Sequence, residues 1–193
     1  MTAWLVGVCM SGTVTMHALF PAVLAAYPDR TCAGCDGYIA PLDCHDLGKR
    51  YELRQFHFHR PSEERVNGRA YDMVVHLVHR NDEGQLAVVA VLLEKGGENP
   101  LIQTLWNNMP LERDMETSPA GPLDLMQLLP DNRGYWIYMG SLTTPPCTEG
   151  VLWMVMKQPV QVSAEQVAIF SRLYRNNARP VQASNGRLIK ESR

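Results

Sequence analysis

Residues 85–94 form a nearly continuous apolar run, with the sequence LAVVAVLL at its centre. A half-buried strand would alternate apolar and polar residues, and an amphipathic helix would place polar residues on one face. The run shows neither pattern, so it predicts a strand that is buried on both faces. The chain is therefore expected to fold around a sheet.

Other strand signals lie on both sides of this run. Strands are expected at residues 54–59, 63–66, 69–79, 135–139 and 151–157. Asn67 and Gly68 form a favoured two-residue hairpin turn between the second and third of these strands. Short helices are expected at about 99–107, at 163–174 and, as one turn in the Pro-rich stretch 111–130, at 123–128. The sequence thus predicts a sheet-dominated α+β fold, with a twisted, mostly antiparallel central sheet and a few peripheral helices.

The composition fits one globular domain. Of the 193 residues, 46% are hydrophobic and 20% are charged, and the net charge is −2. The chain has no long run of like charge, so nothing in its charge balance indicates nucleic acid or an anionic membrane as a partner. No stretch of about 20 consecutive apolar residues is present, so no membrane span is expected.

Residues 1–47 differ in character from the rest of the chain. The first 28 residues contain no Lys, Arg, Asp or Glu, and small, apolar residues occupy positions 22–26 near the end of this stretch. This pattern resembles the apolar part and cleavage site of a secretory signal, although the usual basic start is missing.

Four of the five cysteines also lie in this segment. Cys32 and Cys35, followed by Cys44 and His45, suggest a zinc ribbon, but the second half of that ligand set lacks the required spacing. Loop cysteines or a single disulfide are the preferred interpretation. The odd number of cysteines leaves at least one thiol unpaired within a monomer.

The histidines carry the clearest chemical signal. His57 and His59 are separated by one residue on a predicted strand, so their side chains face the same side, roughly 7 Å apart. His76 and His79 differ by three positions and face opposite sides, so only one of them can join the pair. Three neutral imidazoles would bind Zn²⁺ and leave one tetrahedral position for a water molecule that loses its proton near neutral pH. The alternative, buried histidines satisfied by hydrogen bonds, is less favoured for this pattern.

Separated motifs extend the signal along the chain. They are QFHFH at 55–59, PSE at 61–63, HLVH at 76–79, LAV at 86–88, YW at 135–136, SLTTPPCTEG at 141–150 and NNARP at 176–180. In sequence and order they closely resemble the α-class carbonic anhydrases, particularly bacterial ones.

The resemblance implies a set of catalytic roles. His57, His59 and His76 would bind Zn²⁺, and metal-bound hydroxide would convert carbon dioxide reversibly to bicarbonate and a proton. Thr143 would accept a hydrogen bond from that hydroxide and donate one to Glu63, since a threonine hydroxyl can do both at once.

The resemblance also implies the surroundings of the metal. Gln55 would accept a hydrogen bond from His57, and the backbone near Asn177 would accept one from His59, which fixes each tautomer. Thr144 would line the mouth of the site and help to hold bicarbonate. An apolar wall for carbon dioxide would consist of Val78, Val88, Leu142, Val151 and Trp153.

Two positions near the proposed site depart from the family pattern. Family members usually carry a Glu two residues before the third ligand, where this chain has Val74. Losing such a carboxylate typically costs about 10–100-fold in metal affinity or activity, unless a backbone carbonyl or a water takes its place. The family's buried His after Ser-Glu is replaced here by Glu64, which needs a partner if it is buried.

The N-terminal part departs from the family more broadly. Residues 1–47 contain no Gln-Ser-Pro segment, no Asn-rich strand and no matching proton-shuttle histidine. In the family, that part also brings a cysteine that pairs with one placed like Cys147. We therefore divide the chain into an atypical segment, 1–47, and a carbonic anhydrase domain, 48–193, that lacks its usual N-terminal part. A second copy or another chain is expected to cover the sheet edge exposed by this loss.

Two further interpretations stand beside the enzyme. One is a non-catalytic, carbonic-anhydrase-like zinc-binding module, and the other is a truncated, inactive product. The enzyme is favoured because the chain keeps the three histidines together with Thr143 and Glu63. The resemblance to bacterial members implies a periplasmic or secreted protein, which the N-terminus supports only in part.

Overall fold

The computed structural model describes residues 4–5, 49–109 and 123–192, and the observations below concern these residues. Its centre is β6 (Leu86–Lys95), which is buried along almost its whole length, as the apolar run predicts. β5 (Met73–Arg80) pairs with β6 antiparallel, and β8 (Glu149–Met156) pairs with it parallel on the other side.

Seven strands make up this central sheet. β2 (Glu52–His59) continues it beyond β5, while β7 (Tyr135–Ser141) and then β10 (Lys190–Glu191) continue it beyond β8. The short β9 (Val160–Val162) pairs parallel with the end of β6. Most pairs are antiparallel, which confirms the predicted sheet, although β6 makes it a mixed one. The sequence did not predict β9 or β10.

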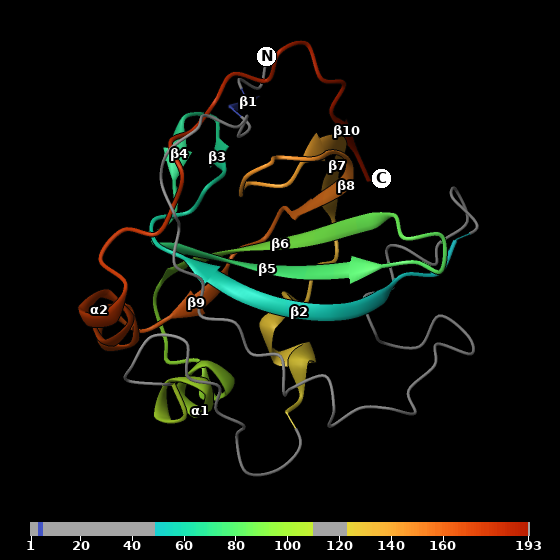
Figure 1. Ribbon diagram of the computed structural model, residues 1–193. Helices are drawn as coiled ribbons and strands as arrows, with labels where there is room; N and C mark the ends of the chain where they lie inside the picture. The colour runs from blue at the N-terminus through green and yellow to red at the C-terminus, as the bar shows by residue number, and fades with distance from the viewer. Residues whose placement is uncertain (1–3, 6–48, 110–122, 193) are drawn as a thin grey trace.

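A small hairpin lies outside the central sheet (Figure 1). β3 (Arg65–Val66) and β4 (Arg69–Ala70) pair antiparallel, and β1 (Trp4–Leu5) pairs with β3. Asn67 and Gly68 have φ angles of 52° and 80° and make the predicted turn.

The predicted continuous strand at 69–79 is wrong in one respect. The chain leaves the hairpin after β4 and begins β5 only at Met73. Ser62 causes this break, because its backbone N–H donates to the carbonyl of Tyr71 and its Oγ accepts from the backbone N–H of Tyr71. These hydrogen bonds turn the chain from one sheet into the other.

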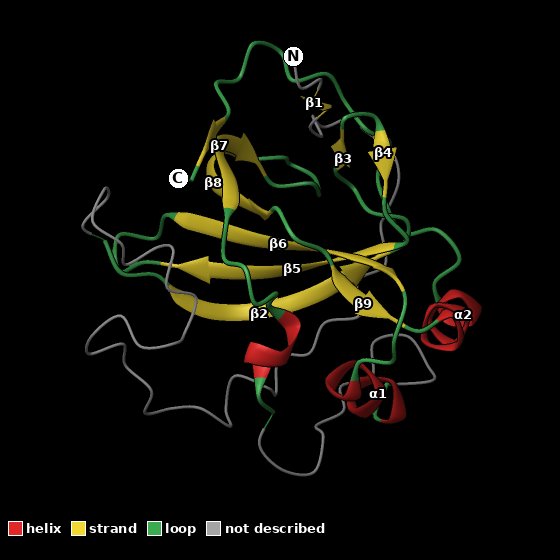
Figure 2. Ribbon diagram, turned by 180° about the vertical axis from the view of Figure 1, so that it is seen from behind, coloured by secondary structure: helices red, strands yellow, loops and turns green. Residues whose placement is uncertain are grey.

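The helices pack together on one face of the central sheet (Figure 2). α1 (Pro100–Asn107) is capped by the side chain of Asn99, and α2 (Ala164–Leu173) begins with the predicted capping box of Ser163 and Gln166. A 3₁₀ turn, η2 (Leu125–Leu128), lies on the same side. Neither α-helix in the described part of the chain has the length and apolar character that crossing a bilayer requires.

The opposite face of the sheet carries a second apolar cluster, which includes Val74, Val88, Val151, Trp153 and Val155. β2 forms one edge of the sheet, with no partner strand beyond it among the described residues. The predicted N-terminal features and most of the predicted loop at 111–130 lie outside those residues. Cys147 forms a disulfide, whose partner also lies outside them.

Candidate metal centre

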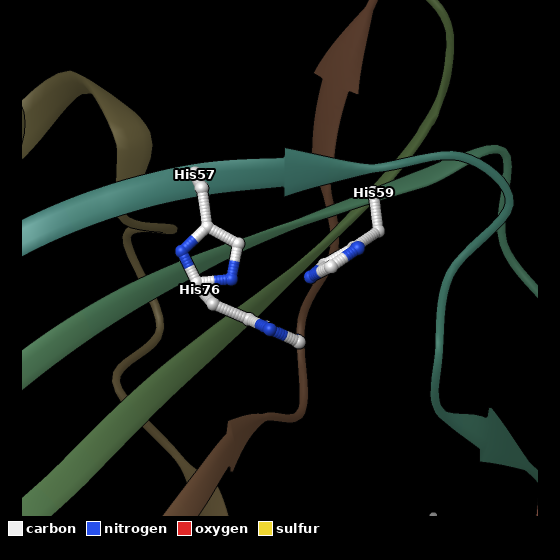
Figure 3. Close-up of side chains that lie close together, drawn as sticks. All are labelled: His57, His59 and His76. Carbon is white, nitrogen blue, oxygen red and sulfur yellow. The ribbon is translucent and has the colours of Figure 1, made fainter. Parts of the chain in front are cut away.

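Three histidines converge on the face of the sheet opposite the helices. His57 and His59 come from β2, and His76 lies directly opposite His57 on β5. All three are buried, and each offers a ring nitrogen within 4.8 Å of those of the others. Figure 3 shows the three rings turned toward one another. The structure therefore adds His76 to the pair of His57 and His59, as the family resemblance implies.

His79 lies on the other face, as the spacing of three residues predicts. It is fully buried, and neither of its ring nitrogens makes a hydrogen bond within the described residues. Burial lowers the pKa of His79 to about 4, and weak interactions with the backbone of Ala87 and Leu77 offset only part of that effect.

The second ring nitrogen of each clustered histidine faces an oxygen. His57 Nδ1 lies 2.8 Å from Gln55 Oε1, and His59 Nδ1 lies 3.1 Å from the carbonyl oxygen of Asn177. Asn177 reaches this place because its side chain bonds the backbone of Phe58 and Arg60 at the end of β2. These contacts leave Nε2 of His57 and His59 as the nitrogens that would bind a metal.

His76 has a different partner. Its Nε2 lies 2.8 Å from Oε1 of Glu64, and both residues are buried. Burial by itself would lower the pKa of His76, but the neighbouring Glu64 and, to a lesser degree, Glu63 outweigh it and raise the pKa overall. No pattern in the sequence predicts this contact, although a buried Glu64 was expected to need a partner.

Glu63 lies beside His59. Its Oε1 accepts a hydrogen bond of 2.9 Å from the backbone N–H of Arg179 and lies 3.5 Å from His59 Nδ1. Its Oε2 is buried and has no partner among the described residues. Thr143 lines the same pocket as Glu63 but makes no hydrogen bond with it here, so that contact stays a prediction.

This small pocket lies beside the histidines. Its lining also includes Glu64, Tyr138, Trp153 and Arg179. The Trp153 ring meets that of His76 edge to face, with centroids 5.0 Å apart. Burial lowers the pKa of Arg179, and Glu63 opposes this effect. Arg179 belongs to the NNARP motif, and nothing in the sequence alone indicates that it lines a pocket.

The predicted apolar wall gathers on the same face as the histidines. Val88, Val151 and Trp153 are buried in the cluster there, and Val78 and Leu142 pack against it. Thr144 is partly exposed and follows Thr143 in the loop after β7. These residues lie on the face of the sheet that carries the histidines. Their contact with carbon dioxide or bicarbonate stays a prediction.

The donor set fits Zn²⁺. Three imidazole nitrogens are the ligands of an open catalytic zinc site, which keeps its fourth position for water or substrate. Among the described residues, the group contains no fourth His, Cys, Asp or Glu that would close that position. The oxygens behind the rings hold each imidazole in one orientation, as such sites require.

Comparison with known proteins agrees with this geometry. The sequence model of the eukaryotic-type carbonic anhydrase family matches residues 40–193. The chain belongs to this family, the α-carbonic anhydrases. A carbonic anhydrase of Klebsiella pneumoniae is 47% identical over 145 residues, which are 75% of this chain and 59% of that protein.

Solved carbonic anhydrase structures share the fold. The α-carbonic anhydrase of Thermovibrio ammonificans, solved with the inhibitor sulfanilamide, has a TM-score of 0.72 at 45% identity, covering 74% of this chain and 64% of that one. The α-carbonic anhydrase of Photobacterium profundum has a TM-score of 0.72 at 43% identity, covering 75% and 67%. The stretch that matches the Klebsiella carbonic anhydrase covers 59% of that protein, so the chain spans less than two thirds of its length.

Proposed function

We propose that this chain binds Zn²⁺ through His57, His59 and His76 and catalyses the reversible hydration of carbon dioxide to bicarbonate and a proton. One observation carries the proposal: three buried imidazoles converge, and the second nitrogen of each is held by an oxygen. Zinc, when bound, supplies a nucleophilic oxygen by making a water molecule acidic enough to lose a proton near neutral pH.

The chain's own residues orient the reaction. Thr143 accepts a hydrogen bond from the attacking oxygen and donates its own proton to Oε2 of Glu63, which is buried and has no other partner in the described residues. The backbone N–H of Arg179 holds the other carboxylate oxygen. This fixed acceptor turns the threonine hydroxyl so that the lone pair of the attacking oxygen points at the substrate carbon.

The apolar wall receives the substrate. Carbon dioxide is uncharged and makes few hydrogen bonds, so a dry surface beside the metal suits it better than polar groups. Val88, Val151 and Trp153 provide that surface, with Val78 and Leu142 at its margin. Thr144 helps to hold the bicarbonate product at the mouth of the site.

The assembly and extent of the domain are part of the proposal. Residues 48–193 form a carbonic anhydrase domain without its usual N-terminal part, and a second copy or another chain covers the edge of β2 that has no partner strand among the described residues. Sedimentation of the purified chain tests this assembly, because a purely monomeric protein contradicts it.

A non-catalytic zinc-binding module is the second candidate. The observation in its favour is that Oε2 of Glu63 has no hydrogen bond with Thr143 in the structure. A truncated, inactive product is the third. The three candidates differ in whether they bind zinc and in whether they hydrate carbon dioxide.

Zinc content and carbon dioxide hydration separate them. About one zinc per chain with sulfonamide-sensitive hydration indicates the enzyme, zinc without hydration indicates the module, and an aggregated, zinc-free protein indicates the truncated product. His76→Ala should lose both zinc and activity. The matched control is His79→Leu on the same strand, which faces away from the cluster and should keep its zinc.

A further inference from the structure

The partner of His76 is a buried carboxylate from outside its own strand. Glu64 lies between β2 and β3, and its Oε1 is 2.8 Å from His76 Nε2. The exposed fractions of His76 and Glu64 are 1% and 6%. A hydrogen bond this short between two buried groups fixes the rotation of the imidazole and its tautomer.

No neighbouring side chain on β5 can accept a hydrogen bond from His76 and so fix its orientation. Val74 lies two residues before His76 and therefore faces the same side of β5. It is fully buried in the apolar cluster, and its side chain has no atom that accepts a hydrogen bond. The orientation of His76 therefore depends on Glu64.

The turn that carries Glu64 is itself held in place. Ser62 Oγ donates to the backbone carbonyl of Glu64 at 2.8 Å and accepts from the backbone N–H of Tyr71 at 2.9 Å. The backbone N–H of Ser62 donates to the carbonyl of Tyr71 at 3.1 Å. The carboxylate thus sits on a braced segment rather than on a loose loop, which a positioning group needs.

We propose that Glu64 is the positioning residue of His76, the third metal ligand. It takes over the role of the Glu that family members carry at the position of Val74. Glu64 keeps the proton of His76 on Nε2, so Nδ1 is the nitrogen that binds the metal, whereas His57 and His59 use Nε2. The carboxylate also makes the ligating nitrogen more basic. This inference rests on the zinc site proposed above.

Metal affinity tests the role directly. Zinc dissociation constants are measured by competition with a chelator, together with the visible absorption spectrum of the Co²⁺-loaded protein. Glu64→Ala should bind zinc about 10–100-fold more weakly than the parent, and its cobalt spectrum should change. Glu64→Gln, which keeps an oxygen acceptor but no charge, should fall between them. Glu165→Gln, an exposed position on α2, is the matched control and should match the parent.

A rescue variant separates positioning from packing. Val74→Glu in the Glu64→Ala background returns a carboxylate to the same face of β5, two residues from His76, and should recover part of the lost affinity. A folded double variant that binds zinc no more tightly than Glu64→Ala contradicts the proposal.

The outcomes distinguish this inference from the proposed function. If the parent binds zinc and both Glu64 variants match its affinity and cobalt spectrum, Glu64 has no positioning role and the zinc enzyme still stands. If the parent binds no zinc, the proposed function fails and this inference fails with it. Near-ultraviolet circular dichroism reports folding, and should Glu64→Ala not fold, the near-isosteric Glu64→Gln decides by the same criteria.

Discussion

Trp153 packs edge to face against His76, with ring centroids 5.0 Å apart and ring planes at 81°. Its indole N–H donates to the carbonyl of Ser141 at 3.0 Å. The tryptophan therefore connects His76 on β5 to the end of β7, where the loop with Thr143 begins. Any shift of the indole ring is expected to reach both the metal ligand and that loop.

Gly140 makes this packing possible. A Cβ at position 140 would lie 2.8 Å from Cδ1 of Trp153, which is too close for that ring to stay in place, and 3.0 Å from Cε2 of Tyr138, which is a tight contact. We expect Gly140→Ala to destabilise the fold by about 1–3 kcal/mol, the usual cost of overpacking a core. Urea unfolding followed by tryptophan fluorescence measures the change, and an unchanged midpoint would show that the rings have room to move.

Thr143 is expected to act on turnover and not on metal binding. Thr143→Val keeps the shape of the side chain but removes the hydroxyl, so kcat should fall about 10²-fold or more, the scale of losing one catalytic hydrogen bond. Zinc content should stay the same. Thr104→Val, an exposed threonine on α1, is the control. Equal kcat values for the two variants would remove Thr143 from the mechanism.

The exit of the proton is expected to depend on buffer. The described residues contain no histidine outside the metal cluster except the buried His79, so no exposed imidazole in that part of the chain can pass a proton to solvent. Turnover at fixed pH should therefore rise with imidazole concentration. A flat response over a wide concentration range would mean that another group carries the proton.

His79 should make the fold sensitive to acid. Its pKa of about 4 in the folded chain lies below the ordinary value of 6.5, so between these pH values the unfolded chain binds a proton that the folded chain does not. The free energy of unfolding therefore has its full value above pH 6.5. It falls by on the order of 3 kcal/mol as the pH drops toward 4. His79→Leu removes this contribution.

Unfolding midpoints between pH 7.5 and about 4.5 measure the effect. The parent should lose more stability than His79→Leu over this range, while the metal ligands titrate alike in both proteins and cancel in the difference. Parallel stability curves would show that His79 accepts a proton without leaving the core.

The repeating patterns of the sequence predicted most of the fold. The apolar run of β6, the alternation in β2, the Asn67–Gly68 turn and the cap at Ser163 are local signals that tertiary contacts reinforce. The break before β5 was missed because Ser62 makes it, nine residues earlier in the chain. β9 and β10 were missed because strands of two or three residues are too short to show a periodic pattern. Each forms only because its neighbouring strand, β6 or β7, is already in place.

The site was predicted in part for similar reasons. Strand alternation pairs His57 with His59 and allows only one of His76 and His79 to join them, and the resemblance to the family selects His76. The contact between Glu64 and His76 joins a turn to a strand, and no spacing rule encodes such a contact. A signal was nevertheless present, because both departures from the family pattern, Val74 and Glu64, concern the surroundings of the same histidine.

The three ligands and Glu64 all lie between residues 57 and 76, on two neighbouring strands and the turn that follows the first of them. Thr143 and the backbone N–H that steadies Glu63 come from much later in the chain. Loading with zinc therefore reports mainly on the early strand pair, with Asn177 as the later residue that holds one of its rings. Turnover requires in addition that the loop with Thr143 has docked beside Glu63, so the two measurements give different readings of how far folding has gone.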